Sequence, residues 1–302
     1  MKVAVTGATG VIGTAVVRAL LDRGDEVAAL SRSAAGARSK LGEEVDLHEW
    51  PDPKGSPAPA AAFADVEGVI HLLGEPVAQR WTDSAKQEIR DSRVLGTRNL
   101  IAGLREAGPR LAVLVSQSAT GFYGPHGSEA VDESTPAGSD FLAGVVVAWE
   151  AEARAADELG LRLVLARTGV VLSESGGALE TMLTPFKLGV GGPVAGGDQY
   201  VPWVHIDDVV GALLFALDTE AASGPVNVTG PQPATNRELS KSLGRALKRP
   251  AVIPVPGFAI KLLYGEMSTI VTTGVRAEPR RLMDLGYAFH YPALDGAVAA
   301  SV

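Results

Sequence analysis

The sequence predicts a doubly wound α/β fold, built on a parallel sheet, with a smaller C-terminal α+β lobe. Three observations predict it. Short runs of β-branched residues alternate with longer helical patterns through the first half of the chain. A glycine-rich turn follows the first of these runs directly. After Ser173 the alternation gives way to a glycine-rich connection and a set of shorter elements.

The alternating half contains short apolar runs that are typical of buried parallel strands. They lie at residues 2–6, 26–30, 69–73, 111–116 and 161–167. Helical spacing predicts helices at residues 11–23, about 82–107 and 140–159. The stretch 52–62 (DPKGSPAPAAA) is rich in proline and alanine, so we expect a loop there.

The second half begins with the glycine-rich connection 189–197 (GVGGPVAGG). A short strand is expected at residues 200–204. A helix at 207–217 and a strand at 226–228 are expected to return the chain to the main sheet. From Pro231 on, short helices and strands predict a small second lobe.

Composition narrows the possible functions. The chain has 302 residues, 46% of them hydrophobic, which is enough for one large core with an annex. Its net charge of −8 argues against nucleic acid or an anionic membrane as the natural partner. With no cysteine, disulfides, zinc–thiolate sites and thiol nucleophiles are excluded, and no pattern of histidines and carboxylates predicts a metal site. No run long and apolar enough to span a membrane occurs, so we expect a soluble cytoplasmic protein.

The glycine-rich turn has the spacing of a phosphate-binding loop. Gly7 permits the tight turn after the strand, Gly10 lets the backbone approach a pyrophosphate, and Gly13 lets the helix pack closely on the strand. The amides at the helix start, with the positive end of the helix dipole, favour an anion there. The whole loop is therefore expected to bind a dinucleotide through Gly7, Thr9, Gly10, Val11, Ile12 and Gly13.

The second strand indicates which dinucleotide. In such folds this strand commonly ends in an acidic residue that binds the adenosine 2′-hydroxyl. Here it ends in Ser31 and Arg32, and no carboxylate follows before Glu43. An arginine can pair with a 2′-phosphate, so the sequence favours NADP(H) over NAD(H). The alternative is that Arg32 is only a solvated surface residue.

Longer blocks resemble the extended short-chain dehydrogenase/reductase superfamily. They are TGATGVIG at residues 6–13, SQSATGFYG at 116–124 and WVHIDD at 203–208. Further blocks at 74–81, 87–93 and 167–172 resemble its "epimerase family protein" branch, and the tail from about Val252 is similar to that branch's C-terminal domain of unknown function. The resemblance implies a Rossmann-type NADP-binding domain from residues 1–172 plus 204–230. A small substrate-binding lobe would comprise 173–203 plus 231–302.

This chain differs from the superfamily pattern at two positions that the pattern assigns to catalysis. Members of the superfamily carry a tyrosine, and a lysine four residues later, on the helix after the strand that ends near Ser116; together they transfer a proton to or from the substrate. Matching that pair to this chain gives Phe141 and Val145. Shifting by one residue, to bring Glu150 into register, gives Leu142 and Val146. All four residues are apolar, so the pair is absent.

The resemblance also implies where other site residues lie. Ser118 matches the serine that orients the substrate, with Thr120 as the nearby alternative, and it has a second explanation as a strand-end serine bound to local backbone. Thr168 and Gly169 would lie beside the nicotinamide. Leu73, Gly74, Arg93 and Ser116 are further expected cofactor contacts. Arg93 has an alternative explanation as a helix-face salt bridge.

Two other groups are candidates for proton transfer. Glu75 follows a strand at the carboxyl edge of the sheet, where burial would raise the pKa of a carboxyl group; pairing of Glu75 with Arg80 or Arg93 is the alternative. Tyr123 supplies a phenol near Ser118, although it is better explained as shaping the substrate loop. Asp207 and Asp208 are explained as caps of the helix that they begin.

Two hypotheses follow. In the first, the chain is an NADP(H)-dependent oxidoreductase or epimerase-like enzyme that acts on an unknown small molecule with relocated acid–base groups. In the second, it is a regulator or scaffold that binds NADP(H) without turnover. The phosphate loop and the polar cleft favour the enzyme, whereas the missing tyrosine and lysine favour the binder. A homodimer is a further possibility that the superfamily suggests, through the helices predicted at 82–107 and 140–159.

Overall fold

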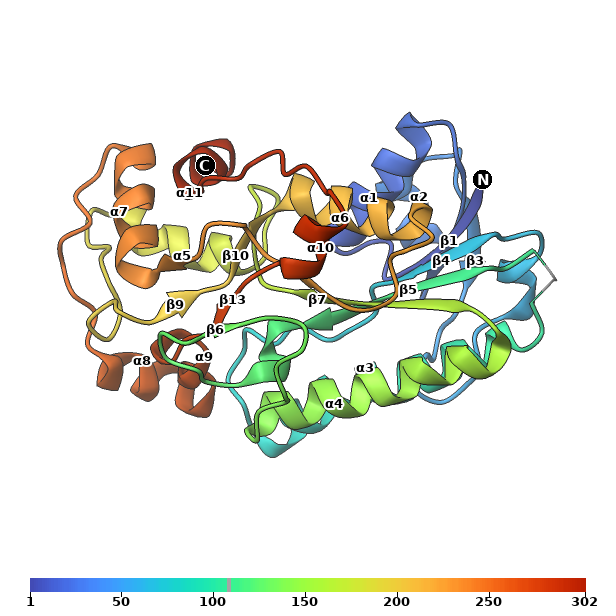
Figure 1. Cartoon of the computed structure of the whole chain (residues 1–302), viewed down its shortest axis with the longest axis horizontal. Coiled ribbons are helices and arrows are strands. Elements are labelled where there is room, and N and C mark those ends of the chain that lie inside the picture. The colour runs from blue at the N-terminus through green and yellow to red at the C-terminus, as the bar shows by residue number, and fades with distance from the viewer. Residues whose placement is uncertain (108–109) are drawn as a thin grey trace.

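The structure is a computed structural model that describes residues 1–107 and 110–302. Its larger part is a seven-stranded sheet with helices on both faces (Figure 1). The strands are β1 (Lys2–Thr6), β2 (Glu26–Ser31), β3 (Asp46–Glu49), β4 (Gly68–His71), β5 (Val113–Ala119), β7 (Arg162–Thr168) and β11 (Gly224–Val228). They lie in the order β11-β7-β5-β4-β1-β2-β3, and all neighbours are parallel. The order reverses between β1 and β4, which is where folds of this kind bind ligands.

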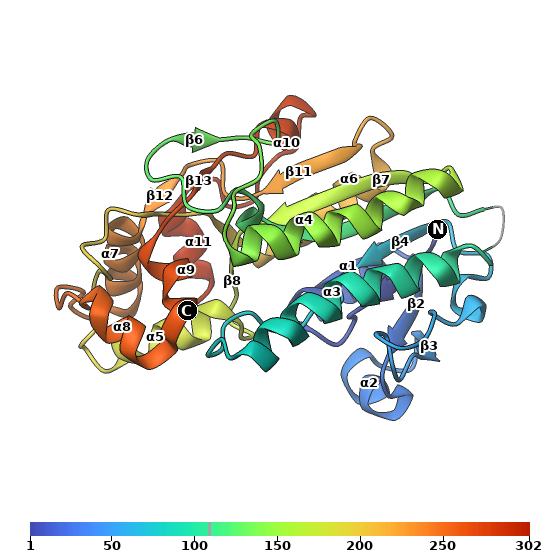
Figure 2. The ribbon, with the colours of Figure 1, turned by 90° about the horizontal axis from the view of Figure 1, so that it is seen from below.

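Each face of the sheet has its own apolar core. The helices of this part are α1 (Val11–Asp22), α2 (Ala34–Leu41), α3 (Asp83–Leu104), α4 (Phe141–Ala153) and α6 (Ile206–Asp218), with the 3-10 turns η1 (Ala60–Phe63), η2 (Thr120–Tyr123) and η3 (Arg154–Leu159). α1 and α6 cover one face, and α3 and α4 lie together on the other (Figure 2). Two-sided coverage explains why the strands read as nearly continuous apolar runs.

A smaller lobe lies beyond the carboxyl ends of the sheet strands (Figure 1). It has a separate apolar core, which includes Leu172, Phe186, Trp203 and Leu243. Helix α7 packs there against α5 and α11. The remaining elements of the described ranges are β6 (Ala130–Val131), β8 (Val170–Leu172), α5 (Ala178–Lys187), β9 (Tyr200–Val201), β10 (Trp203–His205), β12 (Ala234–Thr235), α7 (Asn236–Leu247), α8 (Gly257–Tyr264), η4 (Gly265–Met267), α9 (Ser268–Thr272), β13 (Arg276–Ala277), α10 (Arg280–Asp284), which packs on β11, and α11 (Leu294–Ala300). None of the helices in the described ranges has the length and apolar character needed to cross a membrane.

The predicted fold class is confirmed. Elements that the sequence does not predict, or whose bounds differ from the prediction, have physical explanations. Neither α2 nor β3 is predicted from the sequence. β3 is a polar edge strand (DLHE) with no buried residue, so it lacks the apolar pattern that reveals the inner strands. The single strand expected at 200–204 is two strands, β9, which pairs with β12, and β10, which pairs with β8. Pro202 separates them because it has no N–H group to continue the strand hydrogen bonds. The helix expected at 140–159 is α-helical only to Ala153 and then tightens into η3. The proposed division into two domains stays a prediction.

Candidate functional site: a dinucleotide cleft

The loop after β1 has the close packing that a phosphate-binding turn requires. Gly7 has a φ of +64°, and a Cβ atom there would lie 2.6 Å from the carbonyl oxygen of Leu72. A Cβ atom on Gly13 would lie 2.2 Å from the carbonyl oxygen of Gly7. Only glycine therefore fits at either position without moving the backbone. Gly10 is less confined, since a Cβ atom there would lie 3.3 Å from the same oxygen.

The start of α1 is open to an anion. Its N-cap is Gly10, no side chain caps its first amides, and its first turn contains no acidic residue. By contrast, side chains cap α2, α3, α4 and α7, from Ser33, Thr82, Asp140 and Thr235. Uncapped amides at the positive end of a helix dipole need an external acceptor, and a phosphate is one that suits them.

Next to the loop lies a buried group of three hydrogen-bonded polar side chains, which the sequence does not predict. The imidazole of His71 lies between the hydroxyl groups of Thr6, at 2.7 Å, and Thr97, at 2.9 Å. All three side chains are fully buried. Burial lowers the pKa of His71 from 6.5 to about 3, so the ring is neutral near neutral pH and adds no charge below the phosphate site. The histidines were scattered in the sequence, and only tertiary structure brings these three residues together.

The end of β2 presents Arg32 to solvent. Arg32 is exposed and, within the described ranges, makes no ion pair with a carboxylate. Ser31 is half-buried, and the nearby Glu49 carboxylate accepts a hydrogen bond from the amide of Ala34. Lys40 reaches back to the carbonyl oxygen of Thr9 at 3.4 Å. The end of β2, where related folds commonly have an acidic residue, therefore carries the guanidinium of Arg32. A second cation, Lys40, lies beside the glycine-rich loop.

The segment after β4 is held by Arg93. Its guanidinium donates to the carbonyl oxygens of Glu75, at 2.9 Å, and Ile89, at 3.0 Å. It also lies over the Trp149 ring, 5.2 Å from the centroid. A Cβ atom on Gly74 would be 3.0 Å from the guanidinium carbon, so Gly74 makes room for this arginine. Burial lowers the pKa of Arg93 to about 10, although the charge of Glu75 opposes this. Arg93 thus fixes the loop that carries Leu73, Gly74 and Glu75.

Ser118 belongs to a buried network. Its hydroxyl donates to Glu150 Oε1 at 2.7 Å, and the Glu150 carboxylate also accepts two bonds from the Arg167 guanidinium, at 2.8 and 3.0 Å. Arg167 donates to the Tyr123 hydroxyl at 3.1 Å, and Tyr123 donates to Asn227 at 2.7 Å. The five side chains are all buried, and they join β5, α4, β7, η2 and β11.

Within this network, the hydroxyl groups of two candidate residues, Ser118 and Tyr123, already have hydrogen-bond acceptors inside the protein. The Tyr123 side chain has no exposed surface, and burial raises its pKa to about 12, against the lowering effect of Arg167. Its phenol is therefore protonated and engaged with Asn227. The sequence alone assigns no role to Glu150. Its signal was visible there nonetheless: it is an acidic residue on a mainly apolar stretch of helix, and such a residue requires a partner when it is buried.

Both alignments of the superfamily's tyrosine and lysine place apolar residues of α4 at the two positions. Val145 and Val146 are buried in α4. Phe141 packs edge-on against Trp81, with ring centroids 5.1 Å apart, and the Lys86 ammonium lies 5.1 Å from its ring. Leu142 would contact a Cβ atom placed on Gly121. Neither alignment of the pair brings a proton donor to this part of α4.

Of the remaining predicted cofactor contacts, Ser116 lies within β5, Thr168 ends β7 and Gly169 follows it. Ser116 and Thr168 are buried, and their hydroxyls donate to the carbonyl oxygens of Gln117 and Ala166. Gly169 follows β7, and a Cβ atom there would lie 1.8 Å from the carbonyl oxygen of Pro202. The chain therefore passes from β7 to the small lobe through a contact that only glycine permits.

The interpretation of Asp207 and Asp208 as caps is wrong. The side chain that caps α6 is His205, which accepts from the Asp207 amide at 3.1 Å. Asp208 is buried and instead accepts from the amides of His290, at 2.7 Å, and Tyr291, at 2.9 Å. It anchors the C-terminal segment to α6, which local sequence could not reveal because the partners are about eighty residues away.

The parallel sheet with its strand-order reversal, the glycine loop and the uncapped α1 together define a dinucleotide-binding protein of the Rossmann type. The chain belongs to the NAD dependent epimerase/dehydratase family, whose model matches residues 3–229. A second model, of a domain of unknown function (DUF1731), matches residues 255–301. The resemblance drawn from the sequence motifs is confirmed.

Relatives extend over almost the whole chain. It is 39% identical to an epimerase family protein of Mycobacterium bovis, an alignment that covers 98% of this chain and 96% of that protein. It is 32% identical to an epimerase family protein of Bacillus subtilis, over 99% and 97% of the two chains. A crystal structure of human epimerase family protein SDR39U1 with NADPH has a TM-score of 0.87, at 32% identity, and covers 100% of this chain and 99% of that one.

Proposed function

We propose that this chain binds NADP(H) at the carboxyl edge of its sheet and uses it in an oxidoreductase or epimerase-like reaction on a small molecule. The observation that carries the proposal is the start of α1, which is uncapped over a loop that only glycine can form at Gly7 and Gly13. The human relative crystallised with NADPH supports the same cofactor. NADPH supplies a hydride; the protein supplies binding and orientation.

The preference for the phosphorylated cofactor rests on charge at the end of β2. Arg32 is exposed and has no carboxylate partner within the described ranges, so its guanidinium is free to form charge-assisted hydrogen bonds with a 2′-phosphate. Ser31 is placed to add a hydroxyl. An acid at this site would repel that phosphate, and the nearest glutamate, Glu49, is turned to the Ala34 amide.

The proton-transfer roles are reduced compared with the usual members of the superfamily. Ser118 donates to Glu150, so the lone pairs of Ser118 Oγ are what it can offer a substrate hydroxyl, as an orienting acceptor. Glu75, on the loop that Arg93 holds, is the candidate acid–base group. Thr168 and Gly169 are assigned beside the nicotinamide.

A second candidate function has a specific observation in its favour. Val145 and Val146 are buried apolar residues where proton transfer would require a lysine, and the Ser118 hydroxyl is bound inside the protein. These features suit a regulator or scaffold that binds NADP(H) without turnover. The family membership and the open phosphate site agree equally well with both candidates.

A turnover experiment separates the two candidates. The protein with NADPH is screened against aldehydes, ketones and nucleotide sugars, by loss of NADPH absorbance and by chromatography for epimers. The proposal expects turnover of at least one class, reduced roughly 100-fold or more by Glu75→Gln, with NADPH affinity unchanged. NADPH binding without turnover of any class would favour the regulator. Failure to bind NADPH would contradict both.

A further inference from the structure

One end of the small lobe exposes an unusual number of apolar side chains. Of the thirteen exposed large hydrophobic side chains among the described residues, nine lie between positions 188 and 271. Phe258 and Leu262, four residues apart on α8, are each 77% exposed, and α8 buries none of its residues. Single exposed apolar residues are ordinary, but a contiguous group of this size marks a contact surface.

The segments that carry these side chains lie side by side. The amide of Ile253 donates to the carbonyl oxygen of Gly191 at 3.4 Å, and that of Val255 to Pro193 at 2.9 Å. A Cβ atom on Gly257 would be 3.3 Å from the Ala195 methyl group. The end of α5, the 251–256 segment and α8 therefore form one surface (Figures 1 and 2). We call it the apolar end, and it comprises Leu188, Val190, Val252, Ile253, Phe258, Leu262 and Leu263.

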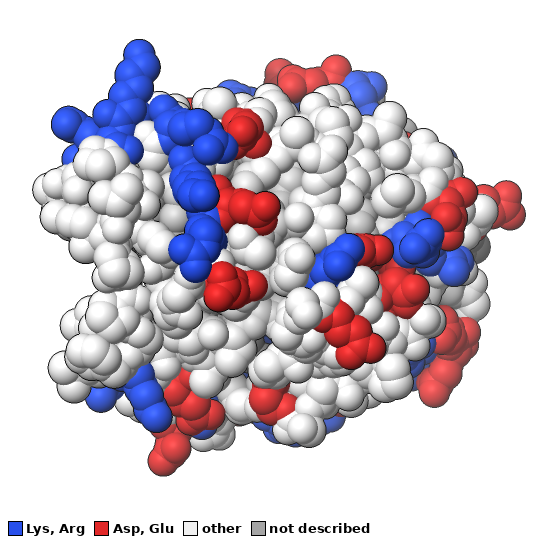
Figure 3. Space-filling view, turned by 60° about the vertical axis from the view of Figure 1, so that its left-hand side comes forward, with Lys and Arg blue, Asp and Glu red and all other residues white. Residues whose placement is uncertain are grey.

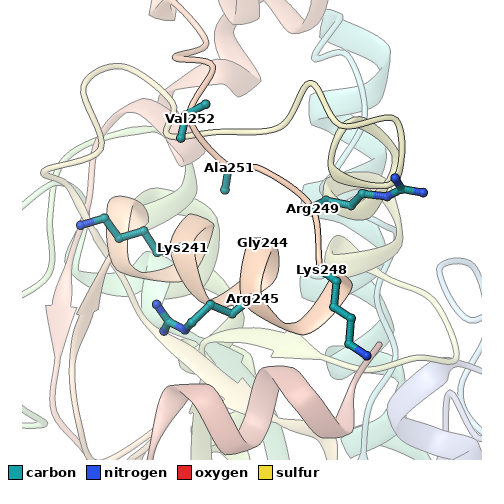
Figure 4. A pocket seen from close by; sticks show the side chains of 7 residues that line it. All are labelled: Lys241, Gly244, Arg245, Lys248, Arg249, Ala251 and Val252. Carbon is teal, nitrogen blue, oxygen red and sulfur yellow. The ribbon is translucent and has the colours of Figure 1, made fainter.

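Cations border this surface. A shallow pocket of about 350 Å³ is lined by Lys241, Gly244, Arg245, Lys248, Arg249, Ala251 and Val252, so its basic side chains adjoin the apolar end at Val252 (Figure 4). Gly244 permits this arrangement, since a Cβ atom there would be 2.6 Å from the Ala251 methyl group. Arg245 pairs with Asp295. No carboxylate in the described ranges forms an ion pair with Lys241, Lys248 or Arg249.

The local charge is opposite to that of the whole chain. Residues 237–261 contain six Lys or Arg and one Glu, whereas the chain as a whole carries a net charge of −8. Figure 3 shows a row of basic side chains with uncharged bulges on one side and acidic side chains on the other. Part of the cluster has a local cause, because Arg245, Lys248 and Arg249 lie at the C-terminal end of α7, where the helix dipole favours cations. Lys261 lies in the last turn of α8 and has the same cause, whereas the dipole does not account for Lys241, in the middle of α7.

From these observations we infer that the apolar end docks on an anionic lipid surface. α8 would lie flat in the interface, with Phe258, Leu262 and Leu263 inserted between head groups, while Lys241, Lys248 and Arg249 bind lipid phosphates. A second copy of this chain fits less well, since pairing two such ends would bring unneutralised cations together. The inference is independent of the proposed enzymatic function and departs from the expectation drawn from the net charge.

Flotation with vesicles tests the inference. The full-length protein is mixed with vesicles of phosphatidylcholine alone, or of three parts phosphatidylcholine to one part phosphatidylglycerol. Binding is expected only to the anionic vesicles, and it weakens as salt is added. Lys248→Gln/Arg249→Gln is expected to bind roughly 30-fold more weakly, and Phe258→Ser/Leu262→Ser at least roughly 100-fold more weakly.

The matched control is Arg18→Gln/Arg105→Gln, which removes two exposed cations from the sheet domain and gives the same net charge as the basic-pocket variant. It is expected to bind anionic vesicles like the wild type. Because all six substituted residues are exposed, each variant should unfold at the wild-type temperature. Absence of vesicle binding, or equal losses in the control and the pocket variant, would overturn the inference. So would a dimer in sedimentation that Phe258→Ser/Leu262→Ser dissociates, without vesicle binding, because the surface would then bind a second copy.

Discussion

The ends of β1 and β5 lie on the same edge of the sheet, yet their polar groups are satisfied in different ways. After β1, the first amides of α1 have no side-chain cap, and the N-cap residue Gly10 is exposed. After β5, Ser118 is bound to Glu150, which is itself bound to Arg167. The first amides of α1 are therefore open to an external acceptor, whereas the Ser118 hydroxyl is already bound within the protein. Under the proposed function, cofactor binding and proton transfer therefore depend on different parts of the chain and can be tested separately.

The largest expected effect concerns the buried network. Glu150→Gln leaves the Arg167 guanidinium buried without its counter-charge, and we expect a loss of about 3–5 kcal/mol in the free energy of unfolding. Denaturant unfolding measures it. Arg167→Gln alone and the double variant complete a thermodynamic cycle, in which a coupling energy near zero would show that the pair does not hold this region together.

The next effect tests the phosphate loop. Gly13→Ala forces a Cβ atom against the Gly7 carbonyl, so we expect about 2–3 kcal/mol of destabilisation and loss of NADPH binding. The control is Gly144→Ala, another glycine inside a helix, where no described atom outside the adjacent helix backbone lies within 4 Å of the added methyl group. That change should stabilise the protein by about 0.5–1 kcal/mol. Equal effects of the two changes would mean that the close contact at Gly13 is unimportant.

A smaller effect appears as a dependence on pH. The folded-state pKa of His71, about 3, lies below the ordinary value of 6.5, so the unfolded chain binds the extra proton first as the pH falls. The contribution of neutral His71 to the free energy of unfolding is fully present above pH 6.5 and is lost as the pH falls toward 3. Between these values the free energy of unfolding changes by up to about 1.4 kcal/mol per pH unit. Unfolding measured from pH 7 to 5 should show this slope in the wild type and not in His71→Gln. An unchanged slope would assign it to other groups.

The sequence was sufficient for the parts of the site that depend on neighbouring residues. Gly7, Gly10 and Gly13 belong to one turn, so their spacing predicted the loop without knowledge of tertiary contacts. Arg32 likewise follows from its place after a strand. The buried groups could not be predicted in this way. Thr6, His71 and Thr97 meet only because β1, β4 and α3 pack together, and Ser118 meets Glu150 across 32 positions of sequence.

The same limit applies to the fold. The inner strands were predicted because burial on both faces makes them continuously apolar, whereas the polar edge strand β3 left no such pattern. The cap of α6 was assigned to aspartates by residue type, yet His205 provides it and Asp208 is committed to a segment near the C-terminus. Side chains with distant partners are the ones that local rules assign wrongly.

Calorimetric titration with NADPH and NADH, on the wild type and on Arg32→Ala, tests the central claim most directly. The account predicts that the wild type binds NADPH more tightly than NADH. It also predicts that Arg32→Ala weakens NADPH by roughly tenfold or more, through loss of a charge-assisted hydrogen bond, and leaves NADH unchanged. The control is Lys54→Ala, which removes a partly exposed cation that pairs with Glu88 and should change neither affinity. Wild-type protein that binds neither nucleotide would contradict the account.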